Sequence, residues 1–283
     1  MEAVAWLAGL KEHYLAWGVV FALLTAFELL NPRESHPVRG RLIGVGFWAV
    51  SLGLSFVFAV ALAFAREAAG IRPLFAIPSV QALVGGTLAA AILGGVLAAL
   101  IHDFFFYWYH RIQHRWLWRW HAVHHSIEEL NAVNSYHHPS EAVMALLLLQ
   151  IPMALVVSID HPASVAVTLV LSAHLVWIHS PTRITLGPLR ALFVDNRFHR
   201  IHHSLEPRHF DRNFGAFTTI WDRLFGTCHM PEGDEWPAVG IAQARQPRSF
   251  RAWASQPWQV GESVAASAEP PYQPAAHADP ATA

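Results

Sequence analysis

Three long apolar runs occupy the first hundred residues of the chain. They cover Tyr14–Leu30, Leu42–Ala65 and Ala76–Ile101. Each run is close to the roughly 20 residues that an α-helix needs to cross a bilayer core about 30 Å thick. A continuous apolar stretch of this length is typical of a transmembrane helix. The pattern therefore predicts three membrane spans, with buried helices of a soluble domain as the less favoured alternative.

Two shorter apolar runs follow later in the chain, Ala142–Ile159 and Ala163–Ile178. They are separated by a short Asp-His-Pro segment. This pattern predicts a helical hairpin over residues 142–178 that dips into the membrane or crosses it. Buried helices of a soluble core would show a similar pattern, so both interpretations of this pair stay open.

Arginines gather in the loop after the first run, in the stretch after the third run, and in the last third of the chain. Loops rich in Lys and Arg stay on the cytoplasmic side of a membrane. Three spans with the first loop inside put all these regions, and the histidines beside them, on that side. We therefore expect an all-α fold: a polytopic, multi-pass integral membrane bundle with a histidine-rich helical cap and its active site on the cytoplasmic side.

These patterns divide the chain into three parts. Residues 1–101 would form the N-terminal transmembrane spans. Residues 102–235 would form a domain that carries three histidine-rich motifs, the histidine boxes described below, and includes the hairpin over 142–178. Residues 236–283 are rich in Ala, Pro and Gln, so we expect a disordered tail with little packed structure.

Composition supports a membrane protein and excludes several function classes. Hydrophobic residues make up 54% of the chain and charged residues only 14%, whereas soluble domains carry about 25% charged residues. The net charge of −1 offers no electrostatic basis for binding nucleic acid. The single cysteine, Cys228, excludes an intrachain disulfide and a cysteine-rich zinc or iron–sulfur site. Histidine is unusually frequent, with 19 residues, as many as Lys and Arg together.

Many of these histidines fall into three boxes of regular spacing. The first box has the spacing H-x3-H, and the second and third have the spacing H-x2-H-H. On a helix, positions i, i+3 and i+4 lie on one face, so each box aims its imidazoles in one direction. The box residues are His110 and His114, then His121, His124 and His125, then His199, His202 and His203.

Metal ions explain why so many imidazoles would converge. Protonated together, the rings would repel one another; neutral and unpaired, each would cost about 1–3 kcal/mol. Metal ions bind neutral imidazole and so remove both problems. One tetrahedral zinc needs four ligands, so eight or more imidazoles indicate two metal ions with room for an exogenous ligand. Imidazole suits Fe, Zn, Cu and Ni, and the spacing alone does not choose among them.

Other residues near the boxes are candidates for the same site. We expect His179 to be a further ligand and His138 to be a possible one. His137 and His174 are close in sequence to these two residues and are also candidate ligands, although a structural hydrogen-bonding role is the favoured interpretation for both.

Two carboxylates are candidates to orient the ligands. A ligating histidine usually donates its second N–H to a carboxylate or carbonyl. Asp103 lies two helical turns before His110 on the same helix face, and Asp222 is another acid near the boxes. We expect these two carboxylates to accept hydrogen bonds from the ligating histidines. A solvated acid or an arginine partner is the equal alternative for each. No catalytic side chain is predicted apart from the metal centre.

Several segments resemble the fatty acid hydroxylase / sterol desaturase superfamily. They are DFFFYWYHRIQH, WHAVHHSIEELN and the run from IHSPTRITLGP through FHRIHHS to NFGAFTTIWDRLFGT. The similarity covers roughly Asp103–Thr227, and the preceding spans fit the membrane architecture of the superfamily.

The resemblance implies a membrane oxidoreductase that hydroxylates or desaturates a lipid C–H bond. It implies a di-iron centre of two Fe ions, O2 as co-substrate and an external electron donor. It makes the eight box histidines ligands, with His179 matching a further histidine of the superfamily. His138–Pro139 matches a histidine–proline pair that only some members have, and the spacing of His174 differs from that in relatives. No fused cytochrome b5 domain is evident, so a separate cytochrome b5- or ferredoxin-like partner would supply electrons.

Two rival functions follow from the same residues. A di-zinc membrane hydrolase commonly needs a carboxylate as bridge or base, whereas these boxes are almost pure imidazole. A metal transporter or sensor would place ligands inside the spans, and the spans are nearly free of histidine. The pattern therefore favours the oxidoreductase.

Overall fold

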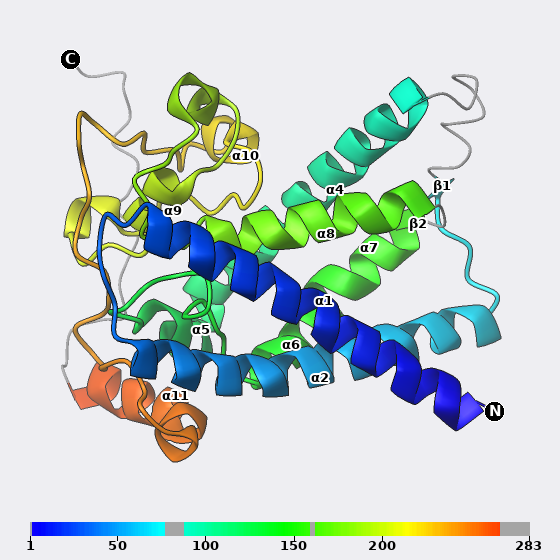
Figure 1. Ribbon diagram of the computed structural model, residues 1–283, viewed down its shortest axis with the longest axis horizontal. Helices are drawn as coiled ribbons and strands as arrows, with labels where there is room; N and C mark the ends of the chain where they lie inside the picture. Colours follow the sequence, from blue (N-terminus) through cyan, green and yellow to red (C-terminus); the bar gives the residue numbers. More distant parts are fainter. Residues whose placement is uncertain (1, 77–87, 159–161, 267–283) are drawn as a thin grey trace.

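The computed structural model describes residues 2–76, 88–158 and 162–266. These residues are helical apart from loops and two short strands, β1 (Phe75–Ala76) and β2 (Val157–Ser158), which pair in parallel. Figure 1 shows long helices on one side of the molecule and short helices joined by loops on the other. The predicted all-α class is confirmed at this level.

The first two apolar runs form long helices that cross each other, α1 (Glu2–Leu30) and α2 (Val38–Ala68) (Figure 1). Among the described residues, the segment Trp6–Leu30 of α1 and the whole of α2 are long and apolar enough to cross a membrane. The Tyr14 hydroxyl donates to the Ala49 carbonyl at 2.6 Å and holds the two helices together.

The third apolar run continues directly into the first histidine box. Residues 77–87 of this run lie outside the described residues, but α4 (Leu88–Trp116) is one helix from the apolar part through both box histidines. The predicted boundary at residue 101 therefore falls within a continuous helix. The packing of the apolar part of α4 therefore also fixes where the His110 and His114 rings lie.

The predicted hairpin forms two helical arms. The first arm consists of α6 (Ser140–Ala145), the π-helical segment η1 (Leu146–Gln150) and α7 (Ile151–Val156). The second arm is α8 (Pro162–Trp177). Residues 159–161, at the predicted turn, lie outside the described residues.

Short helices carry the remaining histidine boxes. The second box lies on α5 (Trp118–His125), and the third lies on α9 (Asn196–His202) and its C-cap residue, His203. Asp195 caps α9, because its carboxylate accepts hydrogen bonds from the backbone N–H groups of Arg197 and Phe198 at 3.1 and 3.0 Å. The cap fixes where the third box begins.

The expected disordered tail is wrong for the part of it that the structure describes. Residues Phe250–Ala266 form α11, which packs against α5. Trp253 is 2% exposed and stacks on Phe47 with ring centroids 4.5 Å apart. The Gln256 amide donates to the Ser126 hydroxyl at 2.8 Å.

The amphipathic pattern of α11 explains this difference. Trp253, Gln256 and Val260 are spaced three and four residues apart, so they share one face of the helix, and all three are buried. The Ala, Pro and Gln around them suggested an unpacked segment. Residues 267–283 lie outside the described residues.

A buried ion pair fixes the first two helices to the segment after the second box. Arg41 on α2 lies 2.5 Å from Glu28 on α1, and both side chains are at most 9% exposed. The other Glu28 oxygen accepts from the Ala132 N–H at 2.8 Å. A Cβ at Gly44 would lie 2.7 Å from the Val133 carbonyl oxygen, so glycine allows this close approach.

Candidate metal centre

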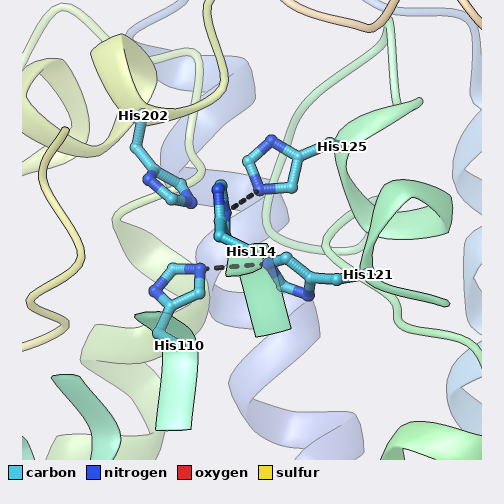
Figure 2. Close-up of side chains that lie close together, drawn as sticks. All are labelled: His110, His114, His121, His125 and His202. Atoms are coloured by element: carbon cyan, nitrogen blue, oxygen red, sulfur yellow. Dashed lines mark hydrogen bonds between the residues drawn. The ribbon is translucent and has the colours of Figure 1, made fainter. Parts of the chain in front are cut away.

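Nine histidines lie in two groups whose ring nitrogens converge, and within each group the donor atoms lie within 4.8 Å of one another. All but His114 are buried. Figure 2 shows the larger group, with rings from three helices pointing toward one another. The five-histidine group contains His110, His114, His121, His125 and His202, and the four-histidine group contains His124, His179, His199 and His203. All eight box histidines and His179 are thus brought together.

The second and third boxes each contribute to both groups. In an H-x2-H-H box, the first and last histidines lie four residues apart on one helix face, and the middle one lies beside them. On α5, His124 alone joins the four-histidine group, while the outer pair of its box joins the five-histidine group. In the third box the middle histidine, His202, joins the five-histidine group, and the outer pair, His199 and His203, joins the four-histidine group. The groups adjoin, since the His125 and His203 rings stack with centroids 4.5 Å apart.

Backbone carbonyls determine which nitrogen of several rings carries the proton. A carbonyl oxygen can only accept, so the Nδ1 that faces it must be the protonated nitrogen, and Nε2 of the neutral ring then carries a lone pair. The four such bonds run from Nδ1 of His110 to Phe214 at 2.9 Å, of His124 to Tyr136 at 3.2 Å, of His179 to Leu175 at 2.9 Å and of His202 to Arg212 at 2.8 Å. This is the arrangement that metal-ligating histidines adopt.

The resulting lone pairs face one another inside the four-histidine group. Nε2 of His124 and Nε2 of His179 lie 3.3 Å apart, and neither neutral ring has a proton there to share. Nε2 of His199 lies 2.9 Å from the same atom of His179. Nδ1 of His199 is also buried without a hydrogen-bond partner. Metal cations between these nitrogens would remove the repulsion, so the donor set fits metal ions.

Burial favours the neutral form that binds metal. Desolvation lowers the pKa of most of these rings well below its ordinary value, and neighbouring imidazoles lower it further. This holds for His110, His121, His124, His125, His199, His202 and His203. Burial lowers the pKa of His179 to about 3.

Two carboxylates contact the outer nitrogens of ligand candidates. Nδ1 of His121 lies 3.0 Å from Glu141, and Nδ1 of His114 lies 3.2 Å from Asp211. Neither acid is one of the two that the sequence led us to expect in this role. Glu141 follows His138–Pro139 at the start of α6, and Asp211 lies in the loop after the third box, but no box spacing indicates a contact with a ring.

Asp103 and Asp222 do not have the contacts predicted for them. In the part of the chain that the structure describes, each accepts hydrogen bonds from the loop 213–219 or from threonine hydroxyls, and none from a histidine ring. Asp103 accepts from the N–H groups of residues 216–218 at 2.8–3.1 Å. Asp222 accepts from those of residues 214 and 215 at 2.8 and 2.7 Å. Asp103 does lie on α4 with His110, as helix periodicity predicts, but the loop that it binds is distant in sequence.

The two acids therefore orient the rings indirectly. The loop that they hold presents the Phe214 carbonyl to His110, and the residue just before it presents the Arg212 carbonyl to His202. Asp211 and Asn213 have φ of 54° and 62°, in the left-handed region, which shows how sharply the backbone turns here. Asn213 supports the turn by donating its amide to the Phe198 carbonyl at 2.9 Å.

Replacing Gly215 by alanine is expected to disturb this loop. The added Cβ would lie 2.5 Å from the Thr218 carbonyl oxygen, so the backbone must shift and carry the Phe214 carbonyl away from His110. We expect metal affinity or activity to fall about 10- to 100-fold, as when a partner of a ligating histidine is lost. Metal analysis and melting temperature would measure the effect.

Gly261 on α11 is the matched control, because its added Cβ would meet only ordinary contacts. Gly261→Ala should leave metal content unchanged and stabilise the helix by up to about 1 kcal/mol. Equal metal content in both variants and the parent protein would contradict the role given to the loop.

The three other histidines that the sequence offered as possible ligands belong to neither of the two histidine groups. The His138 ring turns toward α11, where Nε2 donates to the Ala254 carbonyl at 3.2 Å, and it joins neither group. His137 lies closer, stacked on His124 with centroids 3.9 Å apart and grouped with His121 and Glu141. His174 packs beside Phe217 with centroids 5.3 Å apart, outside both groups.

Comparison with known proteins agrees with this site. The family profile described as fatty acid hydroxylase matches residues 95–227, a range that contains all nine grouped histidines. No solved structure matches the chain significantly.

Three curated relatives illustrate the similarity. Alkylglycerol monooxygenase of Danio rerio is 34% identical over 49% of this chain and 31% of its own length. Ornithine lipid hydroxylase OlsE of Rhizobium tropici is 33% identical over 58% of this chain and 50% of its own length. Very-long-chain aldehyde decarbonylase GL1-6 of Oryza sativa subsp. indica is 28% identical over 47% of this chain and 23% of its own length. The chain thus spans half or less of the length of these relatives, and its residues 95–227 match the fatty acid hydroxylase family.

Proposed function

We propose that this protein is an O2-dependent di-iron oxidoreductase of the membrane that hydroxylates or desaturates a lipid C–H bond. The observation that carries the proposal is the convergence of nine imidazoles in two adjoining groups, with lone pairs directed at one another. The relatives support the substrate class, because their names specify an alkylglycerol, an ornithine lipid and a very-long-chain aldehyde.

Each histidine group would hold one metal ion. Iron bound there would supply the redox chemistry with which O2 attacks an unactivated C–H bond. The protein's own contribution is to keep the rings neutral by burial and to fix the protons of four of them on Nδ1 by backbone carbonyls. An external protein, cytochrome b5- or ferredoxin-like, would deliver the electrons.

The contacts of Glu141 argue against a di-zinc hydrolase. Such an enzyme commonly uses a carboxylate on the metal side of its ligands as a bridge or base. Glu141 contacts Nδ1 of His121, on the opposite side of the ring from Nε2. Among the described residues, neither histidine group includes a carboxylate.

A metal transporter is disfavoured by where the ligands lie. Among the described residues, α1 and α2 are the helices that are long and apolar enough to span a membrane, and neither contains any of the nine grouped histidines. On α4, His110 and His114 come after the apolar run, which ends at Ile101. Ligands that line a transport path would lie inside such helices.

We further propose that α1, α2, the third apolar run and the hairpin lie in the bilayer, with the histidine-rich cap on the cytoplasmic side. Large apolar side chains on α1 and α2 support this, since Leu15, Leu23 and Leu42 are 58%, 66% and 66% exposed. An exposed apolar surface of this kind marks contact with a membrane or another protein, and the length of the two apolar helices favours the membrane. A lipid could then reach the histidine groups along the apolar helices without leaving the membrane.

The proposal is tested by product analysis. The protein in lipid nanodiscs is loaded anaerobically with Fe(II), mixed with a pool of lipid classes, and then exposed to O2 with a reductant. We expect a lipid product heavier by one oxygen atom or lighter by two hydrogen atoms. Protein loaded with Zn(II) instead should give no such product, and a zinc-dependent hydrolysis product would favour the rival. Absence of an O2-dependent product with every lipid class would overturn the proposal.

A further inference from the structure

A separate cluster of potential metal ligands shares no residue with the two histidine groups. His209 ends the 3-10 segment η3 (Pro207–His209), and His229 and Glu235 lie in the loop after α10 (Ile220–Leu224). Their donor atoms lie within 4.8 Å of one another. His229 and Glu235 lie beyond the family match, which ends at residue 227. We propose that these three residues bind a divalent transition metal, with Zn2+ the best match to their chemistry.

The distances suit one shared ion. Nε2 of His209 lies 3.2 Å from one Glu235 oxygen, and Nε2 of His229 lies 3.8 Å from the other. Donor atoms that are each about 2.0–2.2 Å from a tetrahedral zinc lie about 3.4 Å apart, between these two values. Two imidazoles and one carboxylate form a donor set that zinc sites use. Because the His229 side chain is 24% exposed, water can fill the fourth position.

The Nε2 nitrogen of His209, which faces Glu235, has no hydrogen-bond partner. The side chain is fully buried, and Nδ1 lies 2.9 Å from the Ser204 hydroxyl oxygen, which also accepts from the Glu206 N–H. Nε2 makes no hydrogen bond, although a Glu235 oxygen is 3.2 Å away. Burial lowers the pKa of His209, so the neutral ring is favoured. With the ring proton on the Ser204 side, a lone pair faces a carboxylate, and a cation between them removes the repulsion.

His229 has the same feature, since its Nε2 is also buried without a hydrogen-bond partner. Its backbone N–H donates to the Asn213 side chain at 2.7 Å, so the residue is positioned independently of its ring. The ring can therefore be replaced with little effect on the local fold.

Arg208 is the competitor for this site. Its guanidinium lies 2.5 Å from a Glu235 oxygen, which a metal ion would need. The Arg208 side chain is 54% exposed, so it can turn into solvent at little cost. Metal binding would release this ion pair, and removing the arginine should tighten metal binding.

The metal would fasten the loop to the end of the third histidine box. Ser204 pairs with Val239 in an isolated bridge, and the Gly240 N–H donates to the His203 carbonyl at 3.3 Å. His203 belongs to the four-histidine group, so the loop lies directly behind a ligand candidate. We expect the ion to raise the melting temperature.

The test counts zinc and does not depend on turnover. The full-length protein in detergent is loaded with Fe(II), desalted, titrated with Zn2+ and analysed for both metals. We expect the parent protein to bind one more zinc per chain than the His229→Gln and Glu235→Gln variants, with unchanged iron. Arg208→Gln should bind this zinc several-fold more tightly than the parent protein.

His36→Gln is the matched control, because Nε2 of His36 lies 3.7 Å from Glu34 and, among the residues that the structure describes, the pair belongs to no cluster with a second imidazole. Its zinc count should equal that of the parent protein. Equal zinc counts in the parent, His229→Gln and Glu235→Gln proteins would overturn the proposed site. A zinc count that differs by one would support it even if the protein oxidised no lipid.

Discussion

Replacing His124 by alanine is expected to remove iron from the four-histidine group and to lower turnover more than 100-fold. Loss of a residue that only orients a ligand costs about 10- to 100-fold, so loss of a ligand should cost more. His124 is fully enclosed, its proton is fixed on Nδ1 by the Tyr136 carbonyl, and its Nε2 faces His179 at 3.3 Å. Metal analysis of the purified variant and the lipid product assay would measure both losses.

His138→Ala is the control for this experiment. The sequence left His138 open as a ligand, but its ring bonds to Ser140 and Ala254 and joins neither histidine group. We expect this variant to keep its iron and most of its turnover. Full iron content after loss of His124, or loss of iron with His138→Ala alone, would contradict the ligand assignment.

Replacing Glu28 by glutamine should lower the free energy of unfolding by about 3–5 kcal/mol, because it leaves the buried charge of Arg41 without a partner. Glutamine keeps an oxygen that can accept from the Ala132 N–H, so the variant isolates the loss of charge. Thermal or denaturant-induced unfolding in detergent micelles would measure the change.

The double variant Glu28→Gln/Arg41→Met provides the matched comparison. With both charges removed, no buried charge is left unpaired, and replacement of a buried pair by apolar groups is often neutral. We therefore expect the double variant to be more stable than Glu28→Gln alone. A loss in the double variant equal to the sum of the two single losses would show that the pair is not coupled.

The same ion pair connects the apolar helices to the metal centre. Glu28 holds Ala132, and a few residues later the Tyr136 carbonyl fixes the proton of His124. Displacement of α1 and α2 would therefore reach a ligand candidate through this short segment. Glu28→Gln should consequently lower metal content as well as stability, and the double variant should recover part of both.

The common direction of the rings within each box could be predicted because it depends on helix periodicity alone. The spacings three and four place the rings of each box on one side of its helix whatever the rest of the chain does. The division between two groups could not be predicted, because it depends on how α5 packs against α9. His124 and His202, the middle members of their boxes, go to opposite groups for that reason.

The orienting acids were missed because their partners are distant in sequence. Asp103 shares a helix face with His110, but the N–H groups that it accepts from belong to residues 216–218. Glu141 and Asp211 reach rings on other segments, which a spacing argument within one helix cannot detect. In the tail, composition concealed a helix whose burial rests on a few residues such as Trp253.

Anomalous diffraction at the iron absorption edge, from crystals of the iron-loaded protein, would locate the metal ions. We expect two iron peaks per chain, one enclosed by the Nε2 atoms of His124 and His179 with the rest of their group, and one enclosed by the five-histidine group. A single peak, or peaks outside both groups, would show that the two histidine groups do not each hold an iron ion.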